Sequence, residues 1–117
     1  MQERRKWWRR KDRPVSVTFR TVRTPDREES AVSLDLSSGG VSFAIPLPLA
    51  LGTLLELEVV LPFDSLPLQA SGRVNWVRDR FAQGVPVYEV GIEFVQMSSA
   101  DRERLGQYLQ SPERQAS

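Results

Sequence analysis

The sequence contains neither cysteine nor histidine among its 117 residues. Without cysteine there is no disulfide framework and no thiolate nucleophile. The absence of both residues also removes the usual zinc sites, the Ser-His-Asp and Cys-His nucleophile systems and histidine acid–base catalysis. Lysine occurs only at positions 6 and 11, in a polar stretch that offers no buried, catalytic amine. We therefore expect a binding protein rather than an enzyme, and we expect no metal cofactor.

Long apolar segments are missing as well. No uninterrupted apolar run comes near the roughly 20 residues that cross a bilayer, so we expect no membrane span. No apolar segment with a small-residue cleavage site follows the basic start, so we expect no secretion signal and take the cytoplasm as the location. Hydrophobic residues make up 40% and charged residues 26% of the chain, which is the composition of a globular protein. The length fits one domain.

Positive charge is concentrated at the start of the chain. Residues 1–13 include seven basic and two acidic residues, a net charge of +5, whereas the remaining 104 residues include nine basic and 13 acidic ones, a net charge of −4. A cationic arm on a mildly acidic body indicates an anionic partner, although a solvated tail has the same composition. The adjacent Trp7 and Trp8 favour the partner, because two indoles are costly to leave in water and can stack on a base.

After the arm, apolar residues alternate with polar ones in six runs, which predicts six half-buried strands. In the second run, Val32, Leu34 and Leu36 are expected to share one face, with Ser33 and Asp35 on the other. We expect the strands at 15–20, 32–36, 41–45, 55–61, 68–78 and 89–94.

The end of the body carries two further signals. In the fifth run, Val74 and Trp76 are expected on one face, and residues 79–86 read as a polar connection to the sixth strand. The period then changes, because Ser98 begins a capping box that predicts a helix continuing through 102–110. The apolar face of this helix consists of Leu105, Tyr108 and Leu109.

This order of elements predicts an all-β fold with one helix. Six short alternating strands joined by turns are typical of a small antiparallel barrel or sandwich, here closed by the C-terminal helix. We favour a six-stranded antiparallel β-barrel over an open sheet, because closure removes exposed strand edges. The expected organisation is therefore a basic arm at 1–13, the barrel with its helix at 14–110 and a polar tail at 111–117.

Two short motifs carry the candidate chemistry. Arg9-x-x-x-Arg13 places two guanidiniums four residues apart, and such groups suit a phosphate or the O6/N7 edge of guanine. Asp35-x-Ser37-x-x-Gly40 places a carboxylate and a hydroxyl on one face of a strand. The carboxylate can accept hydrogen bonds from guanine N1–H and its N2 amine, although the same residues also form serine turns that lead into tight hairpins.

Taken together, the two motifs resemble the signature of the PilZ domain, a bacterial receptor for cyclic di-GMP. Three further stretches extend the resemblance over nearly the whole chain. It implies a six-stranded split barrel with a C-terminal helix, in agreement with the periodicity. The three stretches are Gly72-Arg73-Val74-Asn75-Trp76, Val90-Gly91-Ile92-Glu93-Phe94 and Met97-Ser98-Ser99-Ala100-Asp101-Arg102.

The resemblance also implies a ligand site. By this resemblance, the motif arginines are expected to bind guanine edges and phosphates, and the motif aspartate and serine to contact a guanine. The glycines are expected to leave the surface open beneath the ligand. Arg10 is expected to add a phosphate contact or stacking. Trp76 matches an aromatic that lies close to a guanine in some members, or else packs in the barrel. The implied site residues are Arg9, Arg10, Arg13, Asp35, Ser37, Gly39, Gly40 and Trp76.

The expected mechanism is an ordering switch without covalent chemistry. Ligand phosphates neutralise the arm, which then lies across the barrel and presents a new surface to a downstream protein partner. One alternative is a single-stranded nucleic-acid-binding barrel, but the acidic body would repel such a polymer, so we expect none as partner. The other alternative is a PilZ-like protein-interaction adaptor that binds no nucleotide. The ligand stoichiometry, one molecule or a stacked pair, stays open.

Overall fold

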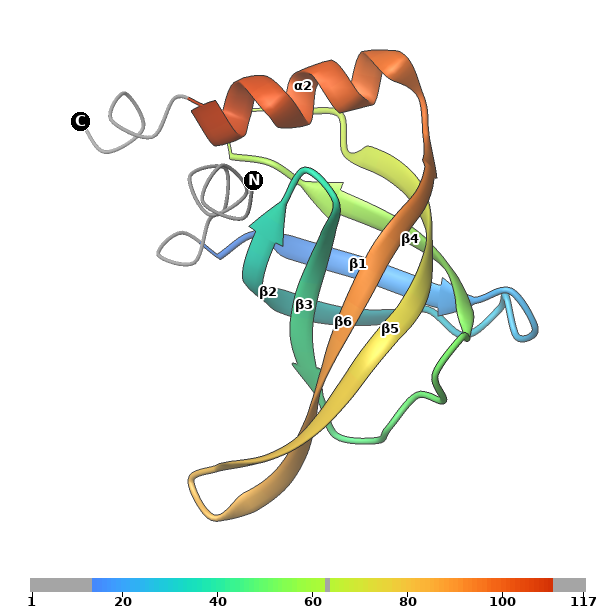
Figure 1. Cartoon of the computed structure of the whole chain (residues 1–117), viewed down its shortest axis with the longest axis vertical. Coiled ribbons are helices and arrows are strands. Elements are labelled where there is room, and N and C mark those ends of the chain that lie inside the picture. The colour runs from blue at the N-terminus through green and yellow to red at the C-terminus, as the bar shows by residue number, and fades with distance from the viewer. Residues whose placement is uncertain (1–13, 63, 111–117) are drawn as a thin grey trace.

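The computed structural model describes residues 14–62 and 64–110 of the chain. In this part the alternating apolar residues form six strands, and the helical period near its end forms a helix (Figure 1). The strands are β1 (Ser16–Thr21), β2 (Glu29–Ser37), β3 (Gly40–Ile45), β4 (Leu54–Val60), β5 (Leu68–Ala82) and β6 (Val85–Met97), and the helix is α2 (Ser99–Gln110).

The six strands close into a barrel in the order β1-β2-β3-β6-β5-β4. Every neighbouring pair is antiparallel, and β4 pairs back onto β1 over six positions, which completes the circle. The buried core is almost entirely apolar, and Phe19 and Phe43 stack within it with ring centroids 5.0 Å apart. The predicted six-stranded antiparallel barrel is confirmed.

The predicted orientation of β2 is wrong in its first half. Val32 and Leu34 are exposed and Ser33 is buried, whereas Leu36 lies in the core as expected. The cause is a β-bulge, because the register with β3 shifts between Ser33 and Asp35. The extra residue turns the alternation over by one position.

Ser33 tolerates burial because its hydroxyl has a partner. Its Oγ accepts a hydrogen bond from the backbone nitrogen of Val15 at 2.9 Å, and the Ser33 backbone nitrogen donates to the Val15 carbonyl at the same distance. These bonds lie next to the first residue pair of β1 and β2, Ser16 and Val32, and hold the residue that precedes β1 close to Asp35. Beyond the bulge, Asp35 and Ser37 lie on the face away from Leu36, as predicted.

A second bulge in β5 overturns the expectation that Val74 and Trp76 share a face. The register with β6 shifts between these two residues, so Asn75 is the extra residue. Val74 is buried in the core, whereas Trp76 is half-buried and lies opposite Gly91. The bulge therefore moves the indole to the outer surface of the barrel.

The polar connection predicted at 79–86 is instead part of one long hairpin. β5 and β6 pair as far as Ala82 opposite Val85, so that only Gln83 and Gly84 form the turn. Both turn residues have positive φ, 53° and 81°, which a two-residue turn matched to the twist of the strands requires. The charged residues that suggested a loop belong to a two-stranded ribbon that projects from the barrel (Figure 1).

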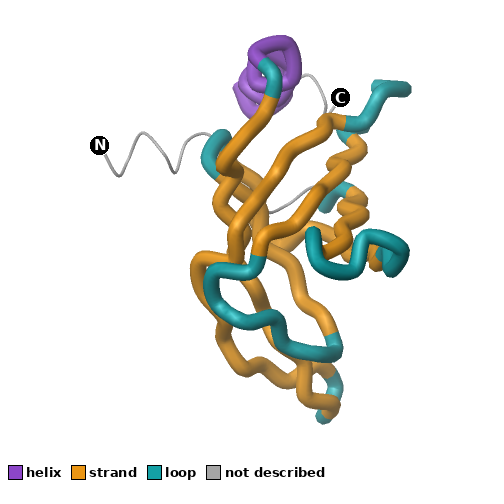
Figure 2. Tube along the Cα trace, turned by 90° about the vertical axis from the view of Figure 1, so that its right-hand side faces the viewer, coloured by secondary structure: helices purple, strands orange, loops and turns teal. Residues whose placement is uncertain are grey.

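Helix α2 begins at the predicted cap. Ser98 Oγ accepts a hydrogen bond from the backbone nitrogen of Asp101 at 3.1 Å. The predicted apolar face, Leu105, Tyr108 and Leu109, is buried. The helix lies across one end of the barrel, far from the hairpin tip (Figure 2). Within the described ranges, no helix has the length and apolar character that crossing a bilayer requires.

Candidate functional site

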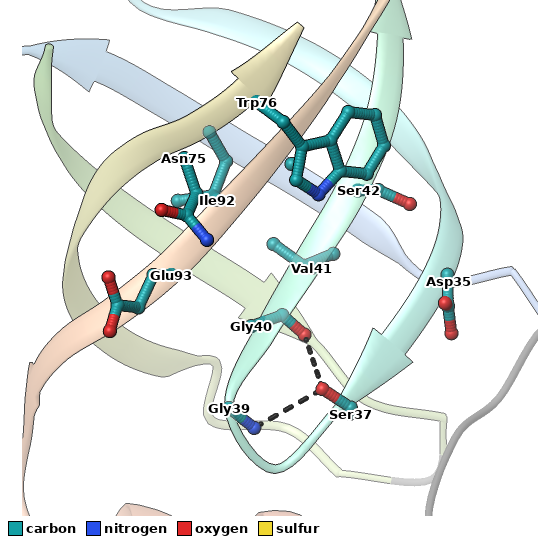
Figure 3. Close-up of a pocket in the computed structure, with 11 residues that line it drawn as sticks. Asp35, Ser37, Gly39, Gly40, Val41, Ser42, Asn75, Trp76, Ile92 and Glu93 are labelled. Carbon is teal, nitrogen blue, oxygen red and sulfur yellow. Dashed lines mark hydrogen bonds between the residues drawn. The ribbon is translucent and has the colours of Figure 1, made fainter. Parts of the chain in front are cut away.

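A pocket of about 290 Å³ opens on the barrel surface where β2, β3, β6 and β5 lie side by side (Figure 3). It brings together every predicted site residue that the structure describes: Asp35, Ser37, Gly39, Gly40 and Trp76. The other three predicted residues, Arg9, Arg10 and Arg13, lie outside the described residues. The remaining lining residues are Val41, Ser42, Asn75, Gly91, Ile92 and Glu93.

The tight turn between β2 and β3 shapes one edge of the pocket. Ser37 Oγ accepts a hydrogen bond from the backbone nitrogen of Gly39 at 3.2 Å and donates one to the carbonyl of Gly40 at 3.4 Å. Ser37 is also paired with Gly40 across the hairpin. The serine turn that was one reading of this motif is therefore present, and it holds the Ser37 hydroxyl at the pocket wall (Figure 3).

The two glycines of this motif differ in what they make room for. A Cβ on Gly40 would overlap the backbone carbonyl oxygen of Ile92, whereas a Cβ on Gly39 would meet nothing within 4 Å. Gly40 pairs with Glu93 across β3 and β6. Its missing side chain therefore lets two backbones approach beneath the pocket. Gly39 has no such structural need.

Trp76 forms another wall of the pocket, and a glycine makes its position possible. The indole lies over Gly91, where a Cβ would overlap atoms of the ring. The ring is therefore packed on the outer surface of the sheet rather than in the core, and it also lines the pocket (Figure 3). An aromatic face at a pocket wall is a surface on which a nucleobase can stack.

The ionisable groups that line the described part of the pocket are both acids. Asp35 and Glu93 lie on opposite sides of it (Figure 3). Ser42 lies on β3, the strand between those of Asp35 and Glu93. Its Oγ is buried and has no hydrogen-bond partner among the described residues. The described walls can therefore accept hydrogen bonds from a base edge, but they supply no positive charge to a phosphate.

Sequence reasoning missed four polar or small residues of this pocket: Ser42, Asn75, Gly91 and Glu93. Asn75 lines the pocket because of the β5 bulge, which the apolar pattern of the sequence does not predict. Gly91 carried a weak signal, because a glycine inside a strand often marks a close approach. Glu93 could have been found from its alternation with the core residues of β6. Within the described ranges, no group of three or more acids, histidines or cysteines could hold a metal ion.

The barrel is similar in structure to several solved proteins. A search of curated proteins found no match. The barrel is similar to MrkH of K. pneumonia in its apo state, with a TM-score of 0.76, 17% identity and coverage of 92% of this chain and 50% of that one. It is also similar to the motility inhibitor MotI/DgrA of Bacillus subtilis, with a TM-score of 0.73, 20% identity and coverage of 92% and 49%. This chain thus spans about half the length of those two proteins.

A third similar structure is the PilZ domain of YcgR from Escherichia coli, solved with c-di-GMP. Its TM-score is 0.66 at 17% identity, and the match covers 88% of this chain and 84% of that one. The sequence itself matches the profile of the PilZ domain over residues 3–111, which is most of its length. The chain belongs to the PilZ domain family.

Proposed function

We propose that this protein is a receptor for cyclic di-GMP, whose guanine binds in the pocket and whose phosphates bind the basic arm at 1–13. One observation carries the proposal: the pocket gathers Asp35, Ser37 and Trp76 beside the point where the arm joins the barrel. Val15 exchanges two hydrogen bonds with Ser33, so the chain enters β1 next to the strand segment that bears Asp35.

The pocket walls suit a guanine. The carboxylate of Asp35 can accept from N1–H and the N2 amine together, an arrangement that adenine does not offer. The Ser37 hydroxyl lies two residues along the same strand and can add a polar contact. Trp76 offers an aromatic surface to the base, worth about 1–3 kcal/mol per stacked base.

The phosphates need cations that the described pocket lacks. Both ionisable lining residues, Asp35 and Glu93, are acids, so a dianionic ligand requires positive charge from another segment. The arm carries a net charge of +5 and includes Arg9, Arg10 and Arg13. Charge-assisted hydrogen bonds of roughly 1.5–3 kcal/mol each offset an ordering cost of about 1–2 kcal/mol per arm residue.

Ligand binding would then order the arm over the barrel. The covered surface is recognised by a downstream protein partner, and no covalent step is needed. The proposal assigns the receptor to the cytoplasm. It is supported by the family match and by the similar PilZ domain of E. coli YcgR, which was solved with c-di-GMP.

Isothermal titration of cyclic di-GMP tests this function. The wild type should bind in the micromolar range or tighter, and Arg13→Ala should lose most of that affinity because a phosphate loses its bidentate partner. Arg23→Ala is a matched control, because Arg23 is an exposed arginine in the turn between β1 and β2. An absence of binding heat in the wild type, or equal affinity in Arg13→Ala and Arg23→Ala, would contradict the proposal.

A single-strand-binding barrel makes a different prediction. It requires basic residues on the barrel face, whereas the outer face of β4 carries Glu56 and Glu58. Random single-stranded DNA should therefore not bind at physiological salt. Tight DNA binding there, with no response to cyclic di-GMP, would favour the nucleic-acid function instead. A response to neither would favour an adaptor that binds only proteins.

A further inference from the structure

Three charged residues and an indole form a cluster beside the pocket, on the outer face of β5 and β6. Trp76 lies opposite Gly91, and Arg78 lies opposite Glu89 in the next row of the same face. Glu89 Oε1 lies 2.5 Å from Nη1 of Arg80 and 3.9 Å from Nη1 of Arg78. The guanidinium carbon of Arg78 lies 5.0 Å from the centroid of the Trp76 ring. The cluster therefore runs from a carboxylate to a wall of the pocket.

Glu89 is only 8% exposed, although it belongs to the outer face of the barrel. A carboxylate removed from water in this way needs ionic partners. Arg80 makes the shorter contact and hydrogen bonds to it directly, so Arg80 supplies the partner that Glu89 requires. Arg78 is farther from Glu89, and its guanidinium contacts the indole of Trp76. Pairing with Glu89 does not by itself explain this contact with the indole.

We propose that Arg78 is a positioning residue for ligand binding: restrained by Glu89, it holds the indole of Trp76 over Gly91 and keeps this wall of the pocket in place. The inference rests on the proposed function, because the ligand in question is cyclic di-GMP. It concerns an arginine of the barrel itself, separate from the arginines of the arm.

The physical reason is preorganisation. A half-buried indole that is free to change rotamer must be ordered when the ligand binds, which lowers the affinity. The missing Cβ of Gly91 gives the Trp76 ring a flat place to lie, and the guanidinium of Arg78 restrains it there by a cation–π contact. A planar guanidinium suits this contact better than a lysine ammonium does.

Titration of cyclic di-GMP into four full-length proteins tests the role of Arg78. Arg78→Gln should weaken binding about three- to tenfold relative to the wild type, the range expected from loss of a cation–π contact. Arg78→Lys should recover part of that loss, because the cation remains. Arg80→Gln is the matched control: this arginine pairs with the same carboxylate, whereas the cation–π contact with Trp76 is made by Arg78. Its affinity should stay within about twofold of the wild type.

A spectroscopic measurement separates positioning from general stability. The chain has three tryptophans, so Trp7→Phe and Trp8→Phe together leave Trp76 as the only indole. In this background, Arg78→Gln should increase acrylamide quenching of the ligand-free protein, because the ring becomes more accessible. Arg80→Gln should leave the quenching unchanged. The thermal midpoint should fall more in Arg80→Gln, which loses the closer partner of the buried Glu89, than in Arg78→Gln. A loss of affinity that is larger in Arg78→Gln therefore does not follow from stability.

The outcomes distinguish this inference from the function on which it rests. If the wild type binds no cyclic di-GMP, the proposed function fails. If the wild type binds and the two glutamine variants bind equally well with equal quenching, the positioning role fails alone. Glu89→Gln gives a second check: in a folded variant, it should raise the quenching of Trp76, because Arg78 then has no carboxylate to restrain it. Unchanged quenching would overturn the role assigned to Glu89.

Discussion

Two arginine–carboxylate clusters lie in different regions of this barrel and are built in opposite ways. Beside the pocket, one buried acid, Glu89, is shared by two exposed arginines. At the helix end, one partly buried arginine, Arg104, is shared by two acids: its Nη2 lies 2.8 Å from Asp64 Oδ2, and its Nη1 lies 2.8 Å from Asp101 Oδ1. The first cluster lies on one hairpin, whereas the second joins the β4–β5 connection to α2.

The two clusters differ in how many hydrogen bonds they make to the backbone of other elements. Arg104 also donates to the carbonyl of Leu66, and Asp101 Oδ2 accepts from the backbone nitrogen of Gln69 at 3.1 Å, so this cluster fastens α2 to the barrel. The pocket cluster makes no such backbone bonds among the described residues. Its arginine Arg78 instead contacts the indole that lines the pocket. We infer that the helix end serves stability and the pocket side serves binding.

The largest effect should come from the helix end. Leu105 is 1% exposed, so Leu105→Ala removes buried methyl groups and leaves a cavity beneath α2. The expected loss is about 2–5 kcal/mol in the free energy of unfolding, measured by urea denaturation. The affinity of the folded fraction for cyclic di-GMP should not change. A large loss of affinity in folded Leu105→Ala would show that the two regions are coupled.

The reverse result is expected from a change under the pocket. Gly91→Ala places a methyl group where the Trp76 indole lies, so the ring must move from its position. Because an indole is a movable side chain, stability should change little, while affinity should fall about tenfold, or ~1.4 kcal/mol. Gly106→Ala in α2 is the matched control, since Gly106 does not line the pocket and its Cβ would meet only the end of the Gln110 side chain, at 3.9 Å. Equal affinities for these two variants would remove Trp76 from the site.

The sequence predicted those parts of the fold that depend on local pattern. The alternation of apolar residues located all six strands, and the spacing of Ser98, Leu105 and Tyr108 located α2 and its cap. The motif of Asp35 and Ser37 located one wall of the pocket, because both side chains lie on the same strand. Each of these features is determined by residues that are close together in the sequence.

The bulges could not be predicted in the same way. Whether Ser33 turns inward depends on Val15, the residue just before β1, which shares the two hydrogen bonds that make its burial acceptable. Likewise, the outward position of Trp76 depends on the missing side chain of Gly91 across the sheet. A period-2 pattern contains no information on such cross-strand partners, so the expected faces of β2 and β5 were partly wrong.

Removing the charge of each pocket acid in turn should change the affinity in opposite directions, by no more than the Gly91→Ala effect. Asp35→Asn should weaken cyclic di-GMP binding about tenfold, because an amide cannot accept both guanine donors. Glu93 is exposed, so its charge acts on the ligand phosphates through water. Glu93→Gln should therefore strengthen binding, by about twofold at low salt and less at high salt. Weaker binding by Glu93→Gln in titrations at two salt concentrations would make Glu93 the residue that reads the base.

The smallest effect concerns pH and the helix cluster. The hydrogen bond from Arg104 lowers the pKa of Asp64 below its ordinary value of 3.8; burial opposes this shift, and the backbone nitrogen of Leu66 adds to it. Because the folded-state pKa is the lower one, Asp64 contributes stability above its ordinary pKa. That contribution is lost as the pH falls through the folded-state value.

The expected signature is a small difference in thermal midpoint between the wild type and Asp64→Asn that is constant near neutral pH. It should disappear as the pH falls below 3.8, where the carboxyl of the wild type becomes protonated. Asp26→Asn, in the exposed turn between β1 and β2, controls for the general effect of removing a negative charge. A difference between wild type and Asp64→Asn that persists undiminished into strong acid would mean that packing of the loop, and not the ion pair with Arg104, fastens α2 to the barrel.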